Sequence, residues 1–201
     1  PTSLIHAIKA LRPTALIGSA VRPGAFDRNV IEEMSKLNTN PIIFPLSNPT
    51  DKAECTFSDA FEWSGGTVTF ASGSPFPPLK DQNNQTHYAA QANNAYIFPS
   101  VGHAAILTEA KSIPDDVMLE MARMLSRMSP EEDLKRGLLF PPLDQIREVS
   151  IKLIAGACLE ICRRKLQGRP HVAERTLEEW EGEVRKSMFS LPDDMTERKA
   201  R

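Results

Sequence analysis

Small polar side chains follow three short apolar stretches of the sequence, at the points where each stretch ends. These residues are Ser19, Ser47 with Asn48, and Ser72. A primary amide such as that of Asn48 offers two N–H donors and one carbonyl acceptor without carrying a charge. A row of such groups suits an elongated ligand that forms many hydrogen bonds, such as a dinucleotide.

The preceding apolar stretches, residues 15–17, 42–46 and 68–71, predict strands. The central one is apolar on both faces, which is typical of a buried strand in a parallel sheet. Residues 27–37 and 57–63 lie between the strands and predict helices. Ligands of such α/β sheets bind beyond the carboxyl ends of the strands. Ser, Asn and Gly also end strands in ordinary turns, so the pattern alone leaves both interpretations open.

Four motifs resemble, in order and in spacing, the carboxyl-terminal part of malic enzymes. They are SNPTDKAEC at residues 47–55, FASGSPF at 70–76, QANNAYIFPS at 91–100 and LLFPPLDQIREVSIKLI at 138–154. Malic enzymes oxidatively decarboxylate malate to pyruvate and carbon dioxide with a nicotinamide cofactor and a divalent metal. The resemblance extends over nearly the whole chain, apart from its last residues.

The resemblance implies an α/β fold with a parallel, Rossmann-like (doubly wound) sheet that is incomplete at its N-terminal half and is followed by C-terminal helices. The sequence contains no GxGxxG motif, which such a fold carries after its first strand. We therefore expect that half of the fold to precede this chain in a parent enzyme. Three segments are predicted: the second half of an NAD(P)-binding domain at 1–112, helices packing on it at 113–190, and a disordered tail at 191–201.

In malic enzymes the asparagine of SNPT contacts both malate and the nicotinamide, and a pair of asparagines further along approaches malate. The resemblance therefore assigns substrate binding to Asn48, Asn93 and Asn94. It assigns cofactor binding to residues of the same loops, namely Ser19, Ala20, Ser47, Asn48, Gly73 and Asn94. For Asn48 the alternative is an Asx-turn that caps the strand.

The loop at residues 18–26, GSAVRPGAF, departs from the family pattern, which carries more glycine, as in GVSGQGGVF. Here Val21, Arg22 and Pro23 replace some of the flexible residues. Bulk and a fixed φ prevent the close backbone approach that glycine allows, so we expect a narrower cofactor cleft. We expect Arg22 to be solvated, and a phosphate contact is the alternative.

Groups that could perform the chemical step do not emerge from the sequence. In malic enzymes the lysine, the tyrosine and the metal-binding carboxylates lie upstream of the segment that this chain resembles. We predict no catalytic residue and no metal ligand in this chain, and an isolated chain without activity. The cofactors of the parent enzyme would be NAD or NADP and Mg²⁺ or Mn²⁺. Cys158 and Cys162 are predicted to be buried thiols, although a metal site at this spacing is conceivable.

The charges of the chain are balanced, with 24 basic and 26 acidic residues and a formal net charge of -2. This balance gives no global field that would attract nucleic acid or an anionic membrane. The expected partners are malate and pyruvate, and further copies of the full-length enzyme in a dimer or tetramer. The three cysteines cannot form a dense disulfide framework, which suggests a reducing compartment, either the cytoplasm or the mitochondrial matrix.

The later part of the chain is helical by pattern. Residues 114–128, 144–166 and 176–188 place apolar side chains at helical spacing. The polar residues 81–88 predict an exposed excursion in which His87 is solvated.

Two functions follow from these observations. The first is the cofactor domain of a malic enzyme, which supplies substrate and nicotinamide contacts. The alternative is a truncated, non-catalytic nucleotide-binding or assembly module that associates with a full-length subunit. Cofactor binding without turnover, even after the missing half is supplied in trans, would favour the alternative.

Overall fold

The computed structural model describes residues 3–189, which fall into two compact units. The first contains the residues up to Asn94 together with Ser126–Pro141, and the second contains Ala95–Leu125 and the residues from Pro142 onward. The predicted segment boundaries at residues 112 and 190 stay predictions. The predicted disordered tail, residues 191–201, lies outside the described residues.

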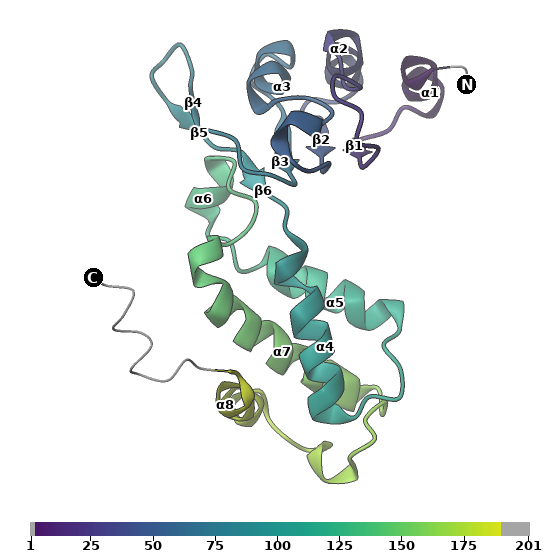
Figure 1. Cartoon of the computed structure of the whole chain (residues 1–201), viewed down its shortest axis with the longest axis vertical. Coiled ribbons are helices and arrows are strands. Elements are labelled where there is room, and N and C mark those ends of the chain that lie inside the picture. The colour runs from purple at the N-terminus through teal and green to yellow at the C-terminus, as the bar shows by residue number, and fades with distance from the viewer. Residues whose placement is uncertain (1–2, 190–201) are drawn as a thin grey trace. The chain divides into compact units, whose positions relative to one another are not determined.

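A four-stranded parallel sheet forms the centre of the first unit, in the order β1-β2-β3-β6 (Figure 1). The strands are β1 (Ala15–Gly18), β2 (Ile42–Pro45), β3 (Thr69–Ser72) and β6 (Ala90–Gln91). The predicted α/β class with a parallel sheet is confirmed, and so are the three predicted strands to within a residue or so at their ends.

Three helices lie side by side along one face of this sheet (Figure 1): α1 (Leu4–Leu11), α2 (Arg28–Leu37) and α3 (Phe57–Trp63). Each begins at a side chain that accepts a hydrogen bond from a backbone N–H of the first turn, an arrangement that stabilises a helix start by about 1 kcal/mol. The three capping residues are Ser3, Asp27 and Thr56.

The two faces of the sheet differ in burial. On the helix-covered face, Ile43 and Phe70 join the apolar core that α1, α2 and α3 contribute to. On the other face, Ile42 and Phe44 are only half-buried, and Ile17 is 62% exposed. Strand β2 is therefore apolar on both faces, but only its helix-covered face is fully buried.

A two-stranded antiparallel hairpin, β4 (Leu79–Lys80) and β5 (Thr86–His87), follows β3. His87 Nε2 lies 3.0 Å from Asp81 Oδ2, and its ring stacks on Phe61 with the centroids 4.7 Å apart. The hydrogen bond with His87 lowers the pKa of Asp81. The expectation that His87 is solvated is wrong, because the hairpin returns the chain to the aromatic side of α3.

The first unit also contains the short helix α6 (Glu131–Lys135) and the 3₁₀ turn η1 (Thr50–Lys52). A second 3₁₀ turn, η2 (Asn94–Tyr96), follows β6.

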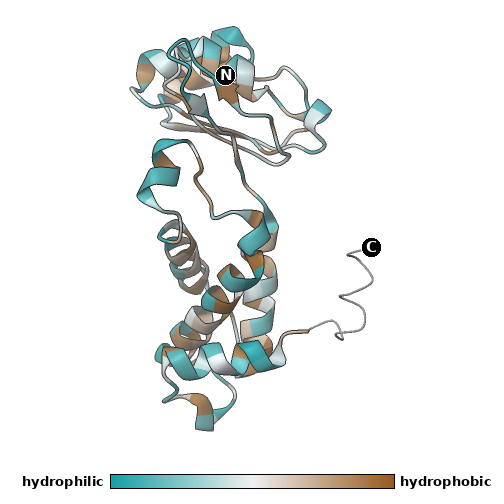
Figure 2. Cartoon of the chain, turned by 90° about the vertical axis from the view of Figure 1, so that its left-hand side faces the viewer, coloured by the Kyte–Doolittle hydropathy of each residue, from teal (hydrophilic) through white to brown (hydrophobic). Residues whose placement is uncertain are grey.

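The second unit is helical. Its helices are α4 (Phe98–Thr108), α5 (Asp115–Ser126), α7 (Ile146–Arg163) and α8 (Leu177–Ser187), with 3₁₀ turns η3 (Leu143–Gln145) and η4 (Pro170–Val172). The predicted ranges 114–128, 144–166 and 176–188 each contain one of these helices, whereas α4 lies outside the predicted ranges. Along these helices apolar and polar residues are interspersed (Figure 2). The helix α7 packs against α4 and α8, and four residues of its predicted apolar stripe are buried: Val149, Leu153, Ala157 and Ile161.

All three cysteines are free and buried, so the prediction of buried thiols for Cys158 and Cys162 is confirmed. Burial raises the pKa of Cys55 to about 12 and the pKa of Cys158 to about 12.

A search of the helices within residues 3–189 finds none that is long and apolar enough to cross a membrane.

Candidate functional site

The carboxyl ends of the parallel strands lie next to one another, and backbone hydrogen bonds continue past the strands into the loops. The N–H of Leu46 donates to Gly18 O at 2.8 Å, and the N–H of Gly73 donates to Pro45 O at 3.3 Å. The N–H of Ala92 donates to the last residue of β3 at 2.9 Å. The polar loops predicted from the sequence therefore form one row along this edge of the sheet.

Ser47 joins the loop after β2 to the loop after β1. Its Oγ accepts a hydrogen bond from Val21 N–H at 2.9 Å and donates one to Glu54 Oε1 at 2.5 Å. The N–H of Ala20 donates to the same carboxylate oxygen at 3.0 Å. Because Ser47 is only 5% exposed, its hydroxyl is used within the protein and fixes the positions of both loops.

Asn48 stands beside Ser47 and is exposed. Its Nδ2 donates to Leu46 O at 3.3 Å, and its Oδ1 accepts a hydrogen bond from Ser74 Oγ at 2.5 Å. In an Asx-turn, the alternative role, Oδ1 would accept from the backbone two residues further on, whereas the donor to Oδ1 here is the hydroxyl of Ser74. An amide nitrogen carries two hydrogens, and within residues 3–189 only one of those of Asn48 has a protein acceptor. The other hydrogen has no acceptor among the residues that the structure describes.

Gly73 makes this arrangement possible. A Cβ atom at Gly73 would lie 2.3 Å from Leu46 O and 2.7 Å from Asn48 Nδ2, closer than such atoms approach. The predicted cofactor role of Gly73 therefore coincides with a packing requirement that admits only glycine.

Ser19 and Ala20 are exposed at the end of β1. Together with Arg22 and Glu54 they line a cavity of about 480 Å³. Arg22 is exposed, as expected from the sequence. Val21 has a φ of 52°, in the left-handed region that β-branched residues rarely adopt. Narrowing of the cleft by this loop stays a prediction.

Asn93 and Asn94 follow β6, one strand further along the same edge. Asn93 is half-buried, and Asn94 is exposed where η2 begins. The side chain of Gln91 connects this end of the row to the preceding loop, because its Nε2 donates to Gly73 O at 3.4 Å.

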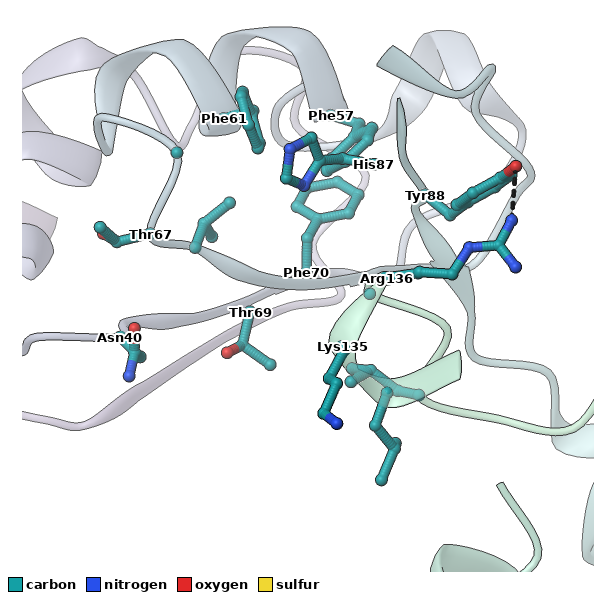
Figure 3. Close-up of a pocket in the computed structure, with 15 residues that line it drawn as sticks. Asn40, Phe57, Phe61, Thr67, Thr69, Phe70, His87, Tyr88, Lys135 and Arg136 are labelled. Carbon is teal, nitrogen blue, oxygen red and sulfur yellow. Dashed lines mark hydrogen bonds between the residues drawn. The ribbon is translucent and has the colours of Figure 1, made fainter. Parts of the chain in front are cut away.

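A second concavity, of about 250 Å³, lies at the other end of β3 and includes Thr67 and Thr69 (Figure 3). Figure 3 shows Phe61 and His87 on one side of this strand and Lys135 on the other. Its charged groups already have protein partners: Lys135 with Glu131 and Glu132, His87 with Asp81, and Arg136 with the hydroxyl and ring of Tyr88. This end of a parallel sheet is also not where ligands bind.

Sequence reasoning missed Glu54. The residue is 1% exposed although it is charged, and it lies between the two polar loops. The available signal was an acidic residue between Ala53 and Cys55, three residues before the predicted helix at 57–63. Charged residues are almost never fully buried without partners, and the partners of Glu54 come from the loops after β1 and β2.

Residues 3–189 contain no group of three or more His, Cys, Asp or Glu side chains that could hold a metal ion. A divalent metal of the kind that the resemblance implies therefore does not fit a side-chain cluster of this stretch.

A parallel sheet whose carboxyl edge carries a row of polar loops, backbone N–H groups and a primary amide defines a nucleotide-binding α/β domain of the Rossmann-like class. The model of the malic enzyme NAD-binding domain matches residues 1–162, and the chain belongs to this family. The resemblance inferred from the sequence motifs is confirmed.

Curated relatives agree with this family. The mitochondrial NAD-dependent malic enzyme of Ascaris suum is 44% identical over 152 residues, which cover 76% of this chain and 24% of that protein. The NADP-dependent malic enzyme of Columba livia is 43% identical over 156 residues, 78% of this chain and 28% of that protein. The chain thus spans about a quarter of the length of the curated relatives it matches.

Solved structures support the fold. The malic enzyme of Entamoeba histolytica matches with a TM-score of 0.68 at 19% identity and covers 86% of this chain and 31% of its own. The malic enzyme of Pyrococcus horikoshii Ot3 matches with a TM-score of 0.64 at 19% identity, over 86% of this chain and 34% of its own. At this identity the likeness shows the shared fold.

Proposed function

We propose that this chain forms the malate- and nicotinamide-facing edge of the NAD(P)-binding domain in a malic enzyme. The reaction of that enzyme oxidises malate to pyruvate and carbon dioxide and reduces NAD(P)⁺. The observation that carries the proposal is the alignment of the loops after β1, β2 and β3, with the Asn48 amide exposed between them. NAD and NADP both remain candidates, because the relatives include enzymes named for each.

Asn48 would bind malate and the nicotinamide through the second hydrogen of its Nδ2. Ser74 supports this role, because its hydroxyl donates to Asn48 Oδ1 and so holds the amide with its nitrogen available as the donor. The malate carboxylate and the carbonyl oxygen of the nicotinamide carboxamide can each accept a hydrogen bond from this N–H. Asn93 and Asn94 would approach malate from the next strand.

The acid, the base and the metal ligands of the reaction would come from other parts of the parent enzyme. Oxidative decarboxylation requires removal of a hydroxyl proton and protonation of an enolate. Uncharged amides such as those of Asn48 and Asn94 can orient a substrate but cannot exchange these protons. The isolated chain would therefore be inactive.

The remaining expectations on partners and compartment belong to the same proposal. We propose that the parent enzyme is a dimer or tetramer whose ligands are malate and pyruvate. Cytoplasm and mitochondrial matrix are the proposed compartments. Relatives named as mitochondrial and as chloroplastic exist among those that match.

Asn48→Ala in the complete, active protein tests the site. Loss of the amide contact, which bound malate would cover, costs about 1–3 kcal/mol, which corresponds to roughly a 5- to 150-fold rise in the malate KM. Asn83→Ala is the matched control, because Asn83 is exposed in the β4–β5 hairpin and bonds through its backbone N–H. Unchanged malate kinetics in Asn48→Ala would refute the assignment. Dinucleotide binding by this chain without malate turnover, even after the missing half is supplied in trans, would instead support the non-catalytic module.

A further inference from the structure

Glu54 is a buried acidic residue with only half of its carboxylate engaged. Its Oε1 accepts hydrogen bonds from Ala20 N–H at 3.0 Å and from Ser47 Oγ at 2.5 Å. Through these two bonds one oxygen joins the loop after β1 to the loop after β2. The side chain therefore lies at the centre of the row of strand ends.

The second oxygen, Oε2, is buried and has no hydrogen-bond partner among the residues that the structure describes. Leaving a buried polar group without a partner costs about 1–3 kcal/mol, and more when the group is charged. Native proteins rarely retain such a group without a function for it. Glu54 lines the cavity of about 480 Å³ beside Ser19 and Ala20. Because Oε2 itself is buried, a donor in this cavity reaches it only if the groups that cover it move.

Gly18 provides the space for this carboxylate. A Cβ atom at Gly18 would lie 2.6 Å from Glu54 Cδ and 2.8 Å from Oε2. The unpartnered oxygen thus lies directly against the last residue of β1. This is the edge of a parallel sheet at which a dinucleotide binds.

The chemistry of the carboxylate limits what it can bind. An ionised carboxylate only accepts hydrogen bonds, and it repels the phosphates of a dinucleotide. The matching group must therefore be a hydroxyl or an amide N–H. In NAD and NADP the donors at the nicotinamide end, which the proposed function places at this edge, are the hydroxyls of its ribose and its carboxamide.

We propose that Glu54 binds the dinucleotide directly, with Oε2 accepting a hydrogen bond from a ribose hydroxyl or from the carboxamide N–H while Oε1 holds the two loops in place. The inference rests on the proposed function, because it names the contact that the same site makes with its cofactor. An ordered water molecule is the competing donor for Oε2. A water would leave dinucleotide affinity independent of this oxygen.

Glu54→Gln separates the two roles in the complete protein that the gene encodes. Glutamine keeps an acceptor for Ala20 and Ser47 but places an NH₂ donor where Oε2 stands, opposite the donor of the ligand. We expect the stability of this variant against urea to be equal to or above that of the unsubstituted protein. The Kd for NAD⁺ or NADP⁺, measured by calorimetry without malate, should rise at least about fivefold.

Glu62→Gln is the matched control, because Glu62 lies on α3 with a side chain that is 70% exposed and pairs with Arg28. It should leave the Kd unchanged. Glu54→Ala removes both oxygens and should lower stability as well as affinity. If that variant does not fold, Glu54→Gln still tests the proposal.

A dinucleotide with an acetyl group in place of the carboxamide distinguishes the two donors. If the amide is the donor, the loss of affinity in Glu54→Gln disappears with this analogue, and if a ribose hydroxyl is the donor, the loss persists. Unchanged affinity of a stable Glu54→Gln variant for the natural dinucleotides would overturn the proposal and indicate water at Oε2. Failure of the unsubstituted protein to bind either dinucleotide would refute the proposed function itself, and this inference with it.

Discussion

Replacement of Gly73 by alanine should disrupt the candidate site through a contact that cannot relax by side-chain rotation. The new Cβ would lie 2.3 Å from Leu46 O, about 0.7 Å short of the closest distance that such atoms reach. It would also lie 2.7 Å from Asn48 Nδ2. Since Leu46 O belongs to the backbone, the loops after β2 and β3 must move apart.

The expected loss of stability is about 3 kcal/mol, the upper end of the range for overpacked positions, because backbone atoms must shift. Urea unfolding of the complete protein measures this value. Gly102→Ala is the control, because Gly102 is an exposed residue of α4 with no other atom within 4 Å of the added Cβ. That substitution should stabilise its helix by about 1 kcal/mol, since alanine has the higher helix propensity.

Binding provides a second measurement on Gly73→Ala. Movement of Asn48 should raise the malate KM, and the opened loops should raise the Kd of the dinucleotide. A Gly73→Ala variant as stable as the unsubstituted protein would show that Leu46 O does not lie this close to residue 73. A destabilised variant with normal binding would show that neither ligand depends on the position of Asn48.

Two further predictions concern backbone strain and acid stability. The left-handed conformation of Val21 costs about 1–2 kcal/mol, and Val21→Gly removes this strain. The greater flexibility of glycine in the unfolded chain offsets about 0.5–1 kcal/mol of the gain, so the melting temperature should rise slightly. A lower melting temperature would contradict the strain at this position. Hydrogen bonds from Arg163 and Arg164 lower the pKa of Glu160 to about 2. The interaction of Glu160 with these two arginines therefore stabilises the protein fully above about pH 4.5. As the pH falls from 4.5 to 2, the free energy of unfolding should decrease by about 1–2 kcal/mol, a value that allows for solvent screening at the exposed arginines. Urea unfolding at pH 7 and pH 3 should show a smaller pH dependence for Glu160→Gln, and identical dependence in both proteins would refute the ion pair's role.

Local physical chemistry explains why most elements could be predicted. The three predicted strands β1, β2 and β3 are short, largely apolar runs that end in Gly, Pro or Ser, and these residues favour turns and strand ends. The helices α2, α3 and α8 start one residue after Asp27, Thr56 and Thr176, whose side chains accept from the first turn. Such signals act within a few residues, so one sequence contains them completely.

Contacts between distant residues explain what could not be predicted. His87 was expected in solvent, but the hairpin places its ring against Phe61 of α3, from which it is separated along the chain by β3 and β4. The hydrogen bond between Ala20 and Glu54 spans 34 residues. In neither contact does the residue type or the spacing along the sequence predict the partner. These contacts exist only because the parallel sheet brings successive strand ends together.

The two glycines of the site follow from the same tertiary arrangement. Neither Gly18 nor Gly73 has a positive φ within the described backbone, so conformational freedom does not require glycine at either position. Each instead lies against a polar side chain from the loops that follow β2: Gly18 against Glu54 and Gly73 against Asn48. The spacing of the three strand ends is therefore set by polar groups of those loops. A larger residue at either position would displace the hydrogen-bonding atoms themselves, so both substitutions should change ligand affinity together with stability.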